Sequence, residues 1–156
     1  MYYFAFGANM NDRGMEYRCP DALKVAPLVL PDYRLVFRGV ADVAPLKGAG
    51  VQGVLWDITE DCEANLDRFE GFPNLYRKEY FLVEIDGEAH EAMFYTMNRS
   101  GYGPPSYSYF DTIQEGYEQN GLPTDTLEAA RTASKNHIRY TPQTKTRRRY
   151  VSNSYR

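Results

Sequence analysis

The chain has 156 residues, of which 43% are apolar, and its formal net charge is −3. This length suits a single domain with one hydrophobic core. No apolar run approaches the ~20 residues of a membrane-spanning helix, and no basic stretch precedes the first apolar residues, so we expect neither a membrane span nor a signal peptide.

The two cysteines, Cys19 and Cys62, are interpreted as packed thiols. They share no CxxC spacing and have no nearby histidine pair, which argues against a zinc site and implies no structural disulfide. On this basis we expect a cytoplasmic protein that uses no metal and no cofactor.

The first half of the chain predicts short strands separated by turn residues. Residues 2–6 read YYFAF and predict the first strand, and Asn11 or Asp12 can cap a short helix that ends before Pro20. Gly53, within the strand predicted at 51–58, indicates that a neighbouring strand comes close at this position. Further strands, separated by turn signals such as Pro31-Asp32 and Gly39, are predicted at 24–30, 33–38, 41–44 and 51–58.

The second half of the chain predicts three helices and one hairpin. Thr59 can cap a helix that Gly71 ends, because glycine readily adopts the left-handed conformation that follows a helix. Asp86-Gly87 predicts a tight turn between strands at 79–85 and 89–96. A helix follows that Ser106 or Ser108 can cap, and the last helix is predicted at about 125–136.

Six or seven short strands with helices inserted between them do not alternate as βα units. This order argues against a doubly wound parallel sheet. It favours an α+β fold, a small mixed β-barrel flanked by short helices. We place one domain at residues 1–140 and a basic C-terminal tail at 141–156.

Positive charge is concentrated at the end of the chain. Residues 139–156 hold six lysines and arginines and no acid, so this segment carries +6 and the remainder carries −9. Such a segment leaves nucleic-acid binding open. A solvated arm, or one that folds onto its own acidic body, is the simpler interpretation, because the body offers no basic face to extend the patch.

Glu70 is the first candidate for chemistry. It lies in the last turn of its predicted helix, directly before Gly71, where the helix dipole disfavours a charged carboxylate. With Phe69 and Phe72 beside it, Glu70 should have a raised pKa, and a raised pKa suits a general base. The alternative is a solvated glutamate on a frayed helix end.

The residues after the first strand form the second candidate. The strand stops at Gly7 and the chain turns through Ala8, Asn9 and Met10 toward a helix. Such a turn presents backbone N–H groups that can bind a carboxylate or an oxyanion. Most tight strand-to-helix turns are structural, so this turn alone is a weak signal.

Six segments, in order and spacing, resemble the gamma-glutamylcyclotransferase family. The first, FAFGANM at 4–10, is similar to the YGSNL-type loop of that family. The others are RCPDA at 18–22, YRLVF at 33–37, VQGVLW at 51–56, the segment 66–76 around Glu70-Gly71, and the stretch from Pro105-Ser106 to GLP at 121–123. The resemblance covers about residues 2–125.

The resemblance implies a small barrel with a cavity at one end and an intramolecular reaction. In the family, the free α-amine of a γ-glutamyl group attacks its own γ-carbonyl and releases 5-oxoproline and an amine or amino acid. One glutamate moves the protons, and Glu70 matches its position. Tyr76 and Tyr109 match family aromatic residues at the pocket, although Tyr109 also continues a core-like stripe with Ile113 and Tyr117.

Two residues depart from the family loop. Phe6 stands where a tyrosine is usual and Ala8 where a serine is usual, so two hydroxyls are missing. The loop 6–10 can still hold a substrate through its backbone N–H groups.

Arg13 and Arg77 could attract a substrate carboxylate, although surface arginines are common.

The expected partner is therefore a small γ-glutamyl compound, bound by a monomer or a homodimer. The alternative is a non-catalytic small-molecule-binding or interaction protein with the same fold, because the two missing hydroxyls could abolish turnover while the cavity remains.

Overall fold

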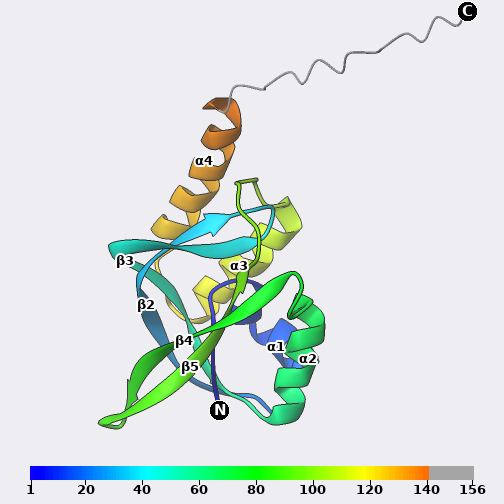
Figure 1. Ribbon diagram of the computed structural model, residues 1–156, viewed down its shortest axis with the longest axis vertical. Coiled ribbons are helices and arrows are strands. Elements are labelled where there is room, and N and C mark those ends of the chain that lie inside the picture. Colours follow the sequence, from blue (N-terminus) through cyan, green and yellow to red (C-terminus); the bar gives the residue numbers. More distant parts are fainter. Residues whose placement is uncertain (141–156) are drawn as a thin grey trace, which may run out of the picture.

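The computed structural model describes residues 1–140, which form an α+β fold built on one curled sheet (Figure 1). The strands are β1 (Tyr2–Ala5), β2 (Leu23–Phe37), β3 (Ala41–Asp57), β4 (Tyr76–Ile85) and β5 (Glu88–Met97). The helices are the 3₁₀ turn η1 (Ala8–Met10), α1 (Asp12–Arg18), α2 (Glu60–Glu70), α3 (Tyr107–Gln119) and α4 (Asp125–Tyr140). The predicted basic tail, residues 141–156, lies outside the described residues.

The sheet has the strand order β2-β3-β1-β5-β4. β1 lies in the middle, antiparallel to β3 and parallel to β5, and the two outer pairs are antiparallel. The predicted α+β fold is confirmed with one difference. Within residues 1–140 the sheet curls but its edge strands β2 and β4 do not pair, so the predicted barrel is not closed.

β2 and β3 form one long bent hairpin, so the four strands predicted at 24–30, 33–38, 41–44 and 51–58 are in fact two. The turn predicted at Pro31-Asp32 is instead a bulge, where the pairing register shifts between Pro31 and Tyr33. Asp32 adopts a φ of 62°, and its carboxylate accepts a hydrogen bond from the N–H of Gly48 on β3 at 2.9 Å. The bulge bends the hairpin without ending it, which helps the sheet to curl.

β1 is the centre of the hydrophobic core. Its residues Tyr3, Phe4 and Ala5 are buried, as the apolar YYFAF segment predicts. Gly53 on β3 lies against them so closely that a Cβ atom there would be 2.4 Å from the carbonyl oxygen of Ala5 and 2.4 Å from the Phe4 ring. The close approach predicted at this glycine is confirmed.

The local signals for helix ends and for the hairpin turn are confirmed. The Thr59 hydroxyl caps α2, and Gly71 ends this helix in the left-handed region with a φ of 70°. Ser106 caps α3. Asp86 and Gly87 both have positive φ, as a two-residue hairpin turn requires.

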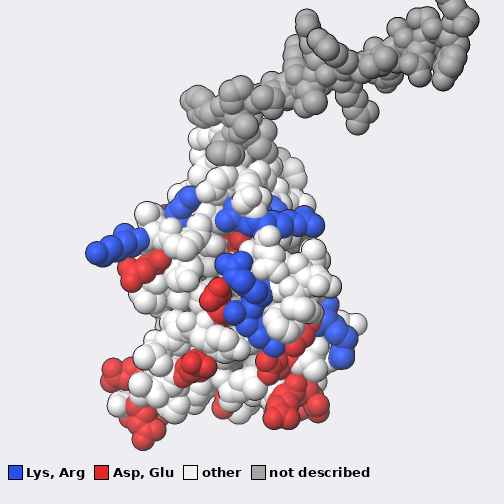
Figure 2. Space-filling view, in the orientation of Figure 1, with Lys and Arg blue, Asp and Glu red and all other residues white. Residues whose placement is uncertain are grey.

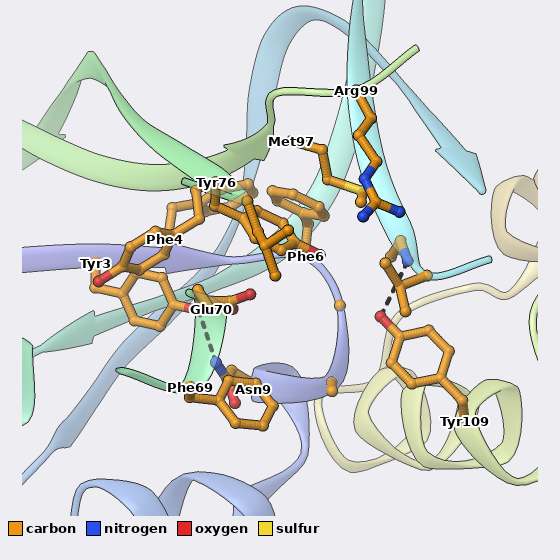
Figure 3. Close-up of a pocket in the computed structure, with 16 residues that line it drawn as sticks. Tyr3, Phe4, Phe6, Asn9, Phe69, Glu70, Tyr76, Met97, Arg99 and Tyr109 are labelled. Carbon is orange, nitrogen blue, oxygen red and sulfur yellow. Dashed lines mark hydrogen bonds between the residues drawn. The ribbon is translucent and has the colours of Figure 1, made fainter. Parts of the chain in front are cut away.

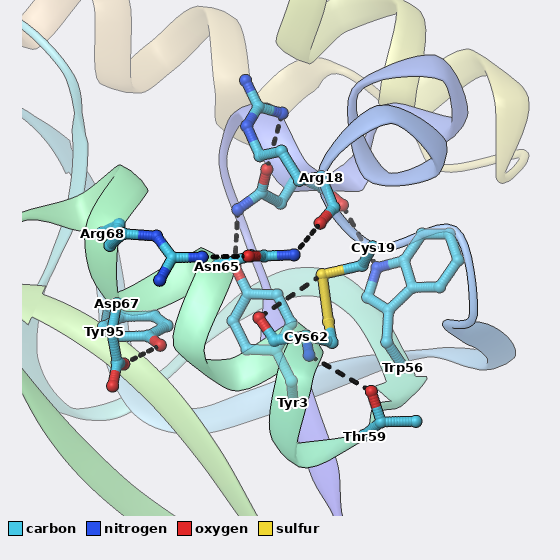
Figure 4. The surroundings of a disulfide bond; sticks show 11 residues. Tyr3, Arg18, Cys19, Trp56, Thr59, Cys62, Asn65, Asp67, Arg68 and Tyr95 are labelled. Atoms are coloured by element: carbon cyan, nitrogen blue, oxygen red, sulfur yellow. Dashed lines mark hydrogen bonds between the residues drawn. A yellow bond between two sulfur atoms is a disulfide. The ribbon is translucent and has the colours of Figure 1, made fainter.

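The prediction that Cys19 and Cys62 are separate packed thiols is wrong, because they form a disulfide (Figure 4). Cys19 directly follows α1 and Cys62 lies in the first turn of α2. The same two helices are joined by a hydrogen bond from the Asn65 side chain to the carbonyl of Arg18 at 3.0 Å. The separation of 43 residues hides this proximity in the sequence. These cysteines therefore give no support to the cytoplasmic location that we expected from them.

Charge is unevenly distributed over the face shown in Figure 2. Basic side chains lie across its middle, and acidic ones gather at the end that carries the β4–β5 turn and the start of α2. The first turn of α2 contains Glu60, Asp61 and Glu63, where carboxylates interact favourably with the helix dipole. None of the helices among residues 1–140 combines the length and the apolar character needed to cross a bilayer.

Candidate active site

A cavity of about 290 Å³ opens at one end of the sheet (Figure 3). Its wall combines β1 and the loop after it, the end of α2, the start of β4, the end of β5 and the first turn of α3. The residues singled out in the sequence that line it are Phe6, Gly7, Ala8, Asn9, Glu70, Tyr76 and Tyr109. Met10 lies elsewhere, fully buried in the core against Gly116 of α3.

Glu70 is the last residue of α2 and lines the cavity. Burial raises the pKa of Glu70 from its ordinary 4.5 to about 7, while the Arg18 guanidinium lowers it and the Asp42 carboxylate raises it further. The raised pKa predicted from the sequence is confirmed, with burial as its main cause. No hydrogen bond from the described residues contributes to this shift, which leaves the carboxylate available to a ligand.

The loop between β1 and α1 offers backbone donors to the cavity. η1 uses the N–H of Met10, which donates to the carbonyl of Gly7 at 3.0 Å. Within the described part of the chain, the N–H groups of Gly7, Ala8 and Asn9 donate to no protein acceptor. Gly7 leaves little room for a side chain, because a Cβ there would lie 3.3 Å from that of Ala41. The three unused N–H groups can receive an anion or a carbonyl oxygen.

Asn9 fixes this loop in place. Its side-chain amide donates to the Tyr3 hydroxyl at 3.0 Å (Figure 3) and accepts from the Arg18 guanidinium at 3.0 Å. Its backbone carbonyl accepts from the Trp56 indole N–H at 3.1 Å; Arg18 and Trp56 are drawn in Figure 4. Arg18 also lies over the Phe69 ring, 3.7 Å from its centre. The network ties the donor loop to the end of α2, so the backbone N–H groups and the carboxylate keep a defined relative position.

Two tyrosines supply hydroxyls that stay protonated. Burial raises the pKa of Tyr109 to about 12, and its hydroxyl accepts a hydrogen bond from the N–H of Ala41 at 3.0 Å. Burial also raises the pKa of Tyr76, and a nearby carboxylate adds to the effect. Ile113 and Tyr117 of the same stripe are core residues, so Tyr109 marks the point where this helix face leaves the core and meets the cavity.

Three contributors escaped the sequence-based reasoning. Tyr3 and Arg99 line the cavity. Arg18 does not line it, but its guanidinium lowers the pKa of Glu70. The available signal for Arg18 was its place in the family-like segment 18–22, whereas Tyr3 is hidden within a core strand. The arginines proposed from the sequence, Arg13 and Arg77, do not line the cavity. Among residues 1–140 there is no group of three or more His, Cys, Asp or Glu that could hold a metal ion.

Comparisons with known proteins identify the family of this chain. Residues 3–117 match the family model described as "Gamma-glutamyl cyclotransferase, AIG2-like". The gamma-glutamylcyclotransferase of Mus musculus is 27% identical over 154 residues, an alignment that covers 88% of this chain and 80% of the relative. The Homo sapiens protein of the same name is 26% identical over 151 residues, covering 86% and 79%.

Solved structures share the fold. A structure named gamma-glutamyl cyclotransferase superposes with a TM-score of 0.73 at 26% identity, and the superposition covers 83% of this chain and 85% of that one. The family model spans well over half of the residues, and the fold and the sequence relatives agree with it. The chain therefore belongs to the gamma-glutamyl cyclotransferase, AIG2-like family.

Proposed function

We propose that this protein is a cyclotransferase that releases 5-oxoproline from a small γ-glutamyl amine or γ-glutamyl amino acid. The observation that carries the proposal is the position of Glu70. Its pKa is raised to about 7 by burial, and it lines a cavity that also contains unused backbone N–H groups. Membership of the family and the names of the relatives support the same reaction.

The chemistry requires a group that both takes and returns protons. The α-ammonium of the substrate must lose one proton before its nitrogen can attack the γ-carbonyl carbon, and that nitrogen loses a second proton after it has closed the five-membered ring. The bond to the leaving nitrogen breaks as this nitrogen is protonated. The ammonium loses two protons to become the lactam N–H, and the leaving amide nitrogen gains two to become an ammonium, so the protons balance. A carboxyl group with a pKa near neutrality exchanges them with little energetic cost.

The loop after β1 has a role that does not depend on hydroxyls. As the carbonyl becomes tetrahedral, negative charge develops on its oxygen, and preorganised N–H donors stabilise it. The N–H groups of Gly7, Ala8 and Asn9 suit either that oxygen or the α-carboxylate of the glutamyl group. Because these donors belong to the backbone, the loss of the family hydroxyls at Phe6 and Ala8 is compatible with turnover.

The test is 5-oxoproline release from a panel of γ-glutamyl amines and amino acids. We expect the wild-type protein to release it and Glu70→Gln to lower kcat by about 10²–10⁴-fold, the usual contribution of a general acid–base group. The exchange keeps the shape of the side chain, so the circular dichroism spectrum should not change.

Glu84→Gln is the matched control, because Glu84 is exposed on β4 and does not line the cavity. It should behave as wild type. If no compound in the panel yields 5-oxoproline but one of them raises the melting temperature, the protein is a non-catalytic binding member of the family and the proposal is wrong.

A further inference from the structure

Among the described residues that line the cavity, Glu70 and Arg99 carry formal charges. Figure 3 shows them well separated, with Arg99 reaching toward the cavity from the loop after β5, next to Met97. The cation that lowers the pKa of Glu70 is Arg18. Arg99 is therefore not the counter-ion of the base, and its charge is available for another purpose.

Arg99 differs from the other arginines near the site in its lack of a partner. Arg18, Arg38 and Arg77 each bind an amide or carboxylate side chain. Among residues 1–140, Arg99 forms no hydrogen bond, ion pair or ring contact, and it is exposed. A guanidinium is a planar fork that binds a carboxylate through two parallel hydrogen bonds. Placed without a partner at the edge of a largely apolar cavity, it favours an anionic group of the ligand.

The loop that carries Arg99 is anchored on both sides. The carboxylate of Asp42, which is 1% exposed, accepts from Arg38 at 2.8 Å and from the N–H of Met97 at 3.1 Å. Arg38 also donates to the carbonyl of Gly101 at 2.5 Å. The chain two residues before and two residues after Arg99 is thereby tied to the β2–β3 turn and the start of β3, which contribute Val40 and Ala41 to the cavity wall. The backbone that carries Arg99 is thus restrained on both sides by contacts with the buried Asp42 carboxylate and its partner Arg38.

The reaction leaves one part of the substrate without a binding group. The backbone N–H groups of the loop after β1 serve the glutamyl part, and Glu70 must reach the leaving nitrogen. In a γ-glutamyl α-amino acid, a second carboxylate is attached one carbon away from that nitrogen. That carboxylate must lie against the cavity wall, and Arg99 is the cation among the described residues that line this wall.

We propose that Arg99 is a specificity-determining residue that binds the carboxylate of the leaving amino acid. Substrates that release an amino acid, which carries this carboxylate, then react faster than substrates that release an amine without a carboxylate. This inference rests on the proposed cyclotransferase function and adds to it the part of the substrate that the protein discriminates.

The test compares two substrates that differ only in this carboxylate, γ-glutamyl-alanine and γ-glutamyl-ethylamine. We expect the wild type to prefer γ-glutamyl-alanine in kcat/KM. Arg99→Gln should lower kcat/KM for γ-glutamyl-alanine by about 10- to 100-fold, as expected for the loss of a charge-assisted hydrogen-bonded pair, and change that for γ-glutamyl-ethylamine by less than about threefold.

Two further variants control for charge and geometry. Arg99→Lys keeps the charge but loses the planar fork, so it should recover part of the preference. Arg13→Gln removes an exposed positive charge on α1 that does not line the cavity, and it should leave the preference unchanged. Equal losses for both substrates would show that Arg99 binds the glutamyl part that they share, and no loss for either would show that it binds no part of the substrate. Both results overturn the inference.

Binding measurements separate this inference from the proposed function. Calorimetry with Glu70→Gln and with the double variant Glu70→Gln/Arg99→Gln reports affinity without turnover. If the wild type turns over neither compound but the double variant loses affinity for γ-glutamyl-alanine alone, the proposed reaction is wrong and the role of Arg99 stands. If both variants bind γ-glutamyl-alanine equally well, the role of Arg99 is wrong whatever the reaction.

Discussion

The ionisation of Glu70 results from opposing influences. Burial and the Asp42 carboxylate raise the pKa of Glu70, and the Arg18 guanidinium holds it down, with about 7 as the outcome. Asp42 is paired with Arg38, and Arg18 is held by Asn9. The charges that adjust the carboxylate are therefore fixed by contacts of their own, so the pKa is a property of the folded site and not of the residue alone.

The pH profile of kcat/KM tests this balance. We expect activity to rise with pH through about 7, because the free enzyme must have Glu70 ionised to accept a proton. Arg18→Met removes the cation that lowers this pKa, so the ascending limb should move to higher pH. Arg18→Lys should keep the limb near its wild-type position. A limb that stays in place in Arg18→Met, or moves to lower pH, would contradict the assignment of the limb to Glu70.

A site residue was predictable from the sequence where its signal depends on neighbours along the chain. Glu70 could be singled out because Gly71 marks a helix end and because the aromatic neighbours suggest burial. Arg99 could not be, since nothing in its own loop indicates that a buried ion pair directs the loop toward the cavity. A contact made between segments far apart in sequence leaves no local pattern.

At the scale of elements, α2 is the part that positions the proposed base. Its Asp67 accepts a hydrogen bond from the Tyr95 hydroxyl at 2.6 Å, and Lys78 of β4 binds both Asp67 and Glu63. The disulfide from Cys62 fixes the first turn of the helix. The helix is thus held by polar contacts along its length and by a covalent bond at the end opposite the cavity.

Removing the disulfide should therefore affect stability more than activity. In the double variant Cys19→Ala/Cys62→Ala, we expect the free energy of unfolding to fall by about 2–4 kcal/mol, because the unfolded chain regains the freedom that the bond removes. Urea denaturation measures this change. The rate of 5-oxoproline release below the denaturation range should stay within about threefold of wild type, since the contacts between α2 and the sheet remain. Unchanged stability would mean that the bond contributes little to the fold.

Helix caps and the hairpin turn were predictable because each depends on a few adjacent residues. Thr59, Gly71 and Asp86-Gly87 needed no knowledge of the sheet. The long β2–β3 hairpin was not predictable in the same way. A bulge at Asp32 has the residue types of a turn, and only pairing with β3 shows that the strand continues past it. The disulfide escaped prediction for a related reason, because it depends on how α1 and α2 pack.

For the whole molecule, the fold class followed from the order of strands and helices, but the topology did not. The central parallel pair of β1 and β5 joins the first and the last strand of the sheet, and no local signal encodes it. This pairing brings the loop after β1 to the same end of the sheet as the loop after β5. The cavity therefore depends on the topology of the sheet, whereas the placement of Glu70, the proposed general base, depends on local sequence.

The raised pKa of Glu70 also makes the stability of the whole molecule depend on pH. Because this pKa is about 7 in the folded protein and 4.5 ordinarily, the folded state binds more protons between these values, so stability falls as pH rises through this window. Glu70→Gln removes the free-energy cost of burying an ionised carboxylate. We expect the variant to gain about 1–3 kcal/mol more over wild type at pH 8 than at pH 5, as measured by urea denaturation. An equal gain at both pH values would show that burial does not raise the pKa of the Glu70 carboxylate.

The central position of β1 has a consequence for biosynthesis. Tyr2 of this strand pairs with Asp57 on one side and with Ala92 on the other, so a ribosome completes β1 well before either partner exists. During that interval the apolar segment YYFAF has no sheet to join, and its exposed backbone can pair with another nascent chain. The strand that organises the finished core is thus an apolar segment that the growing polypeptide exposes until its partner strands have been made.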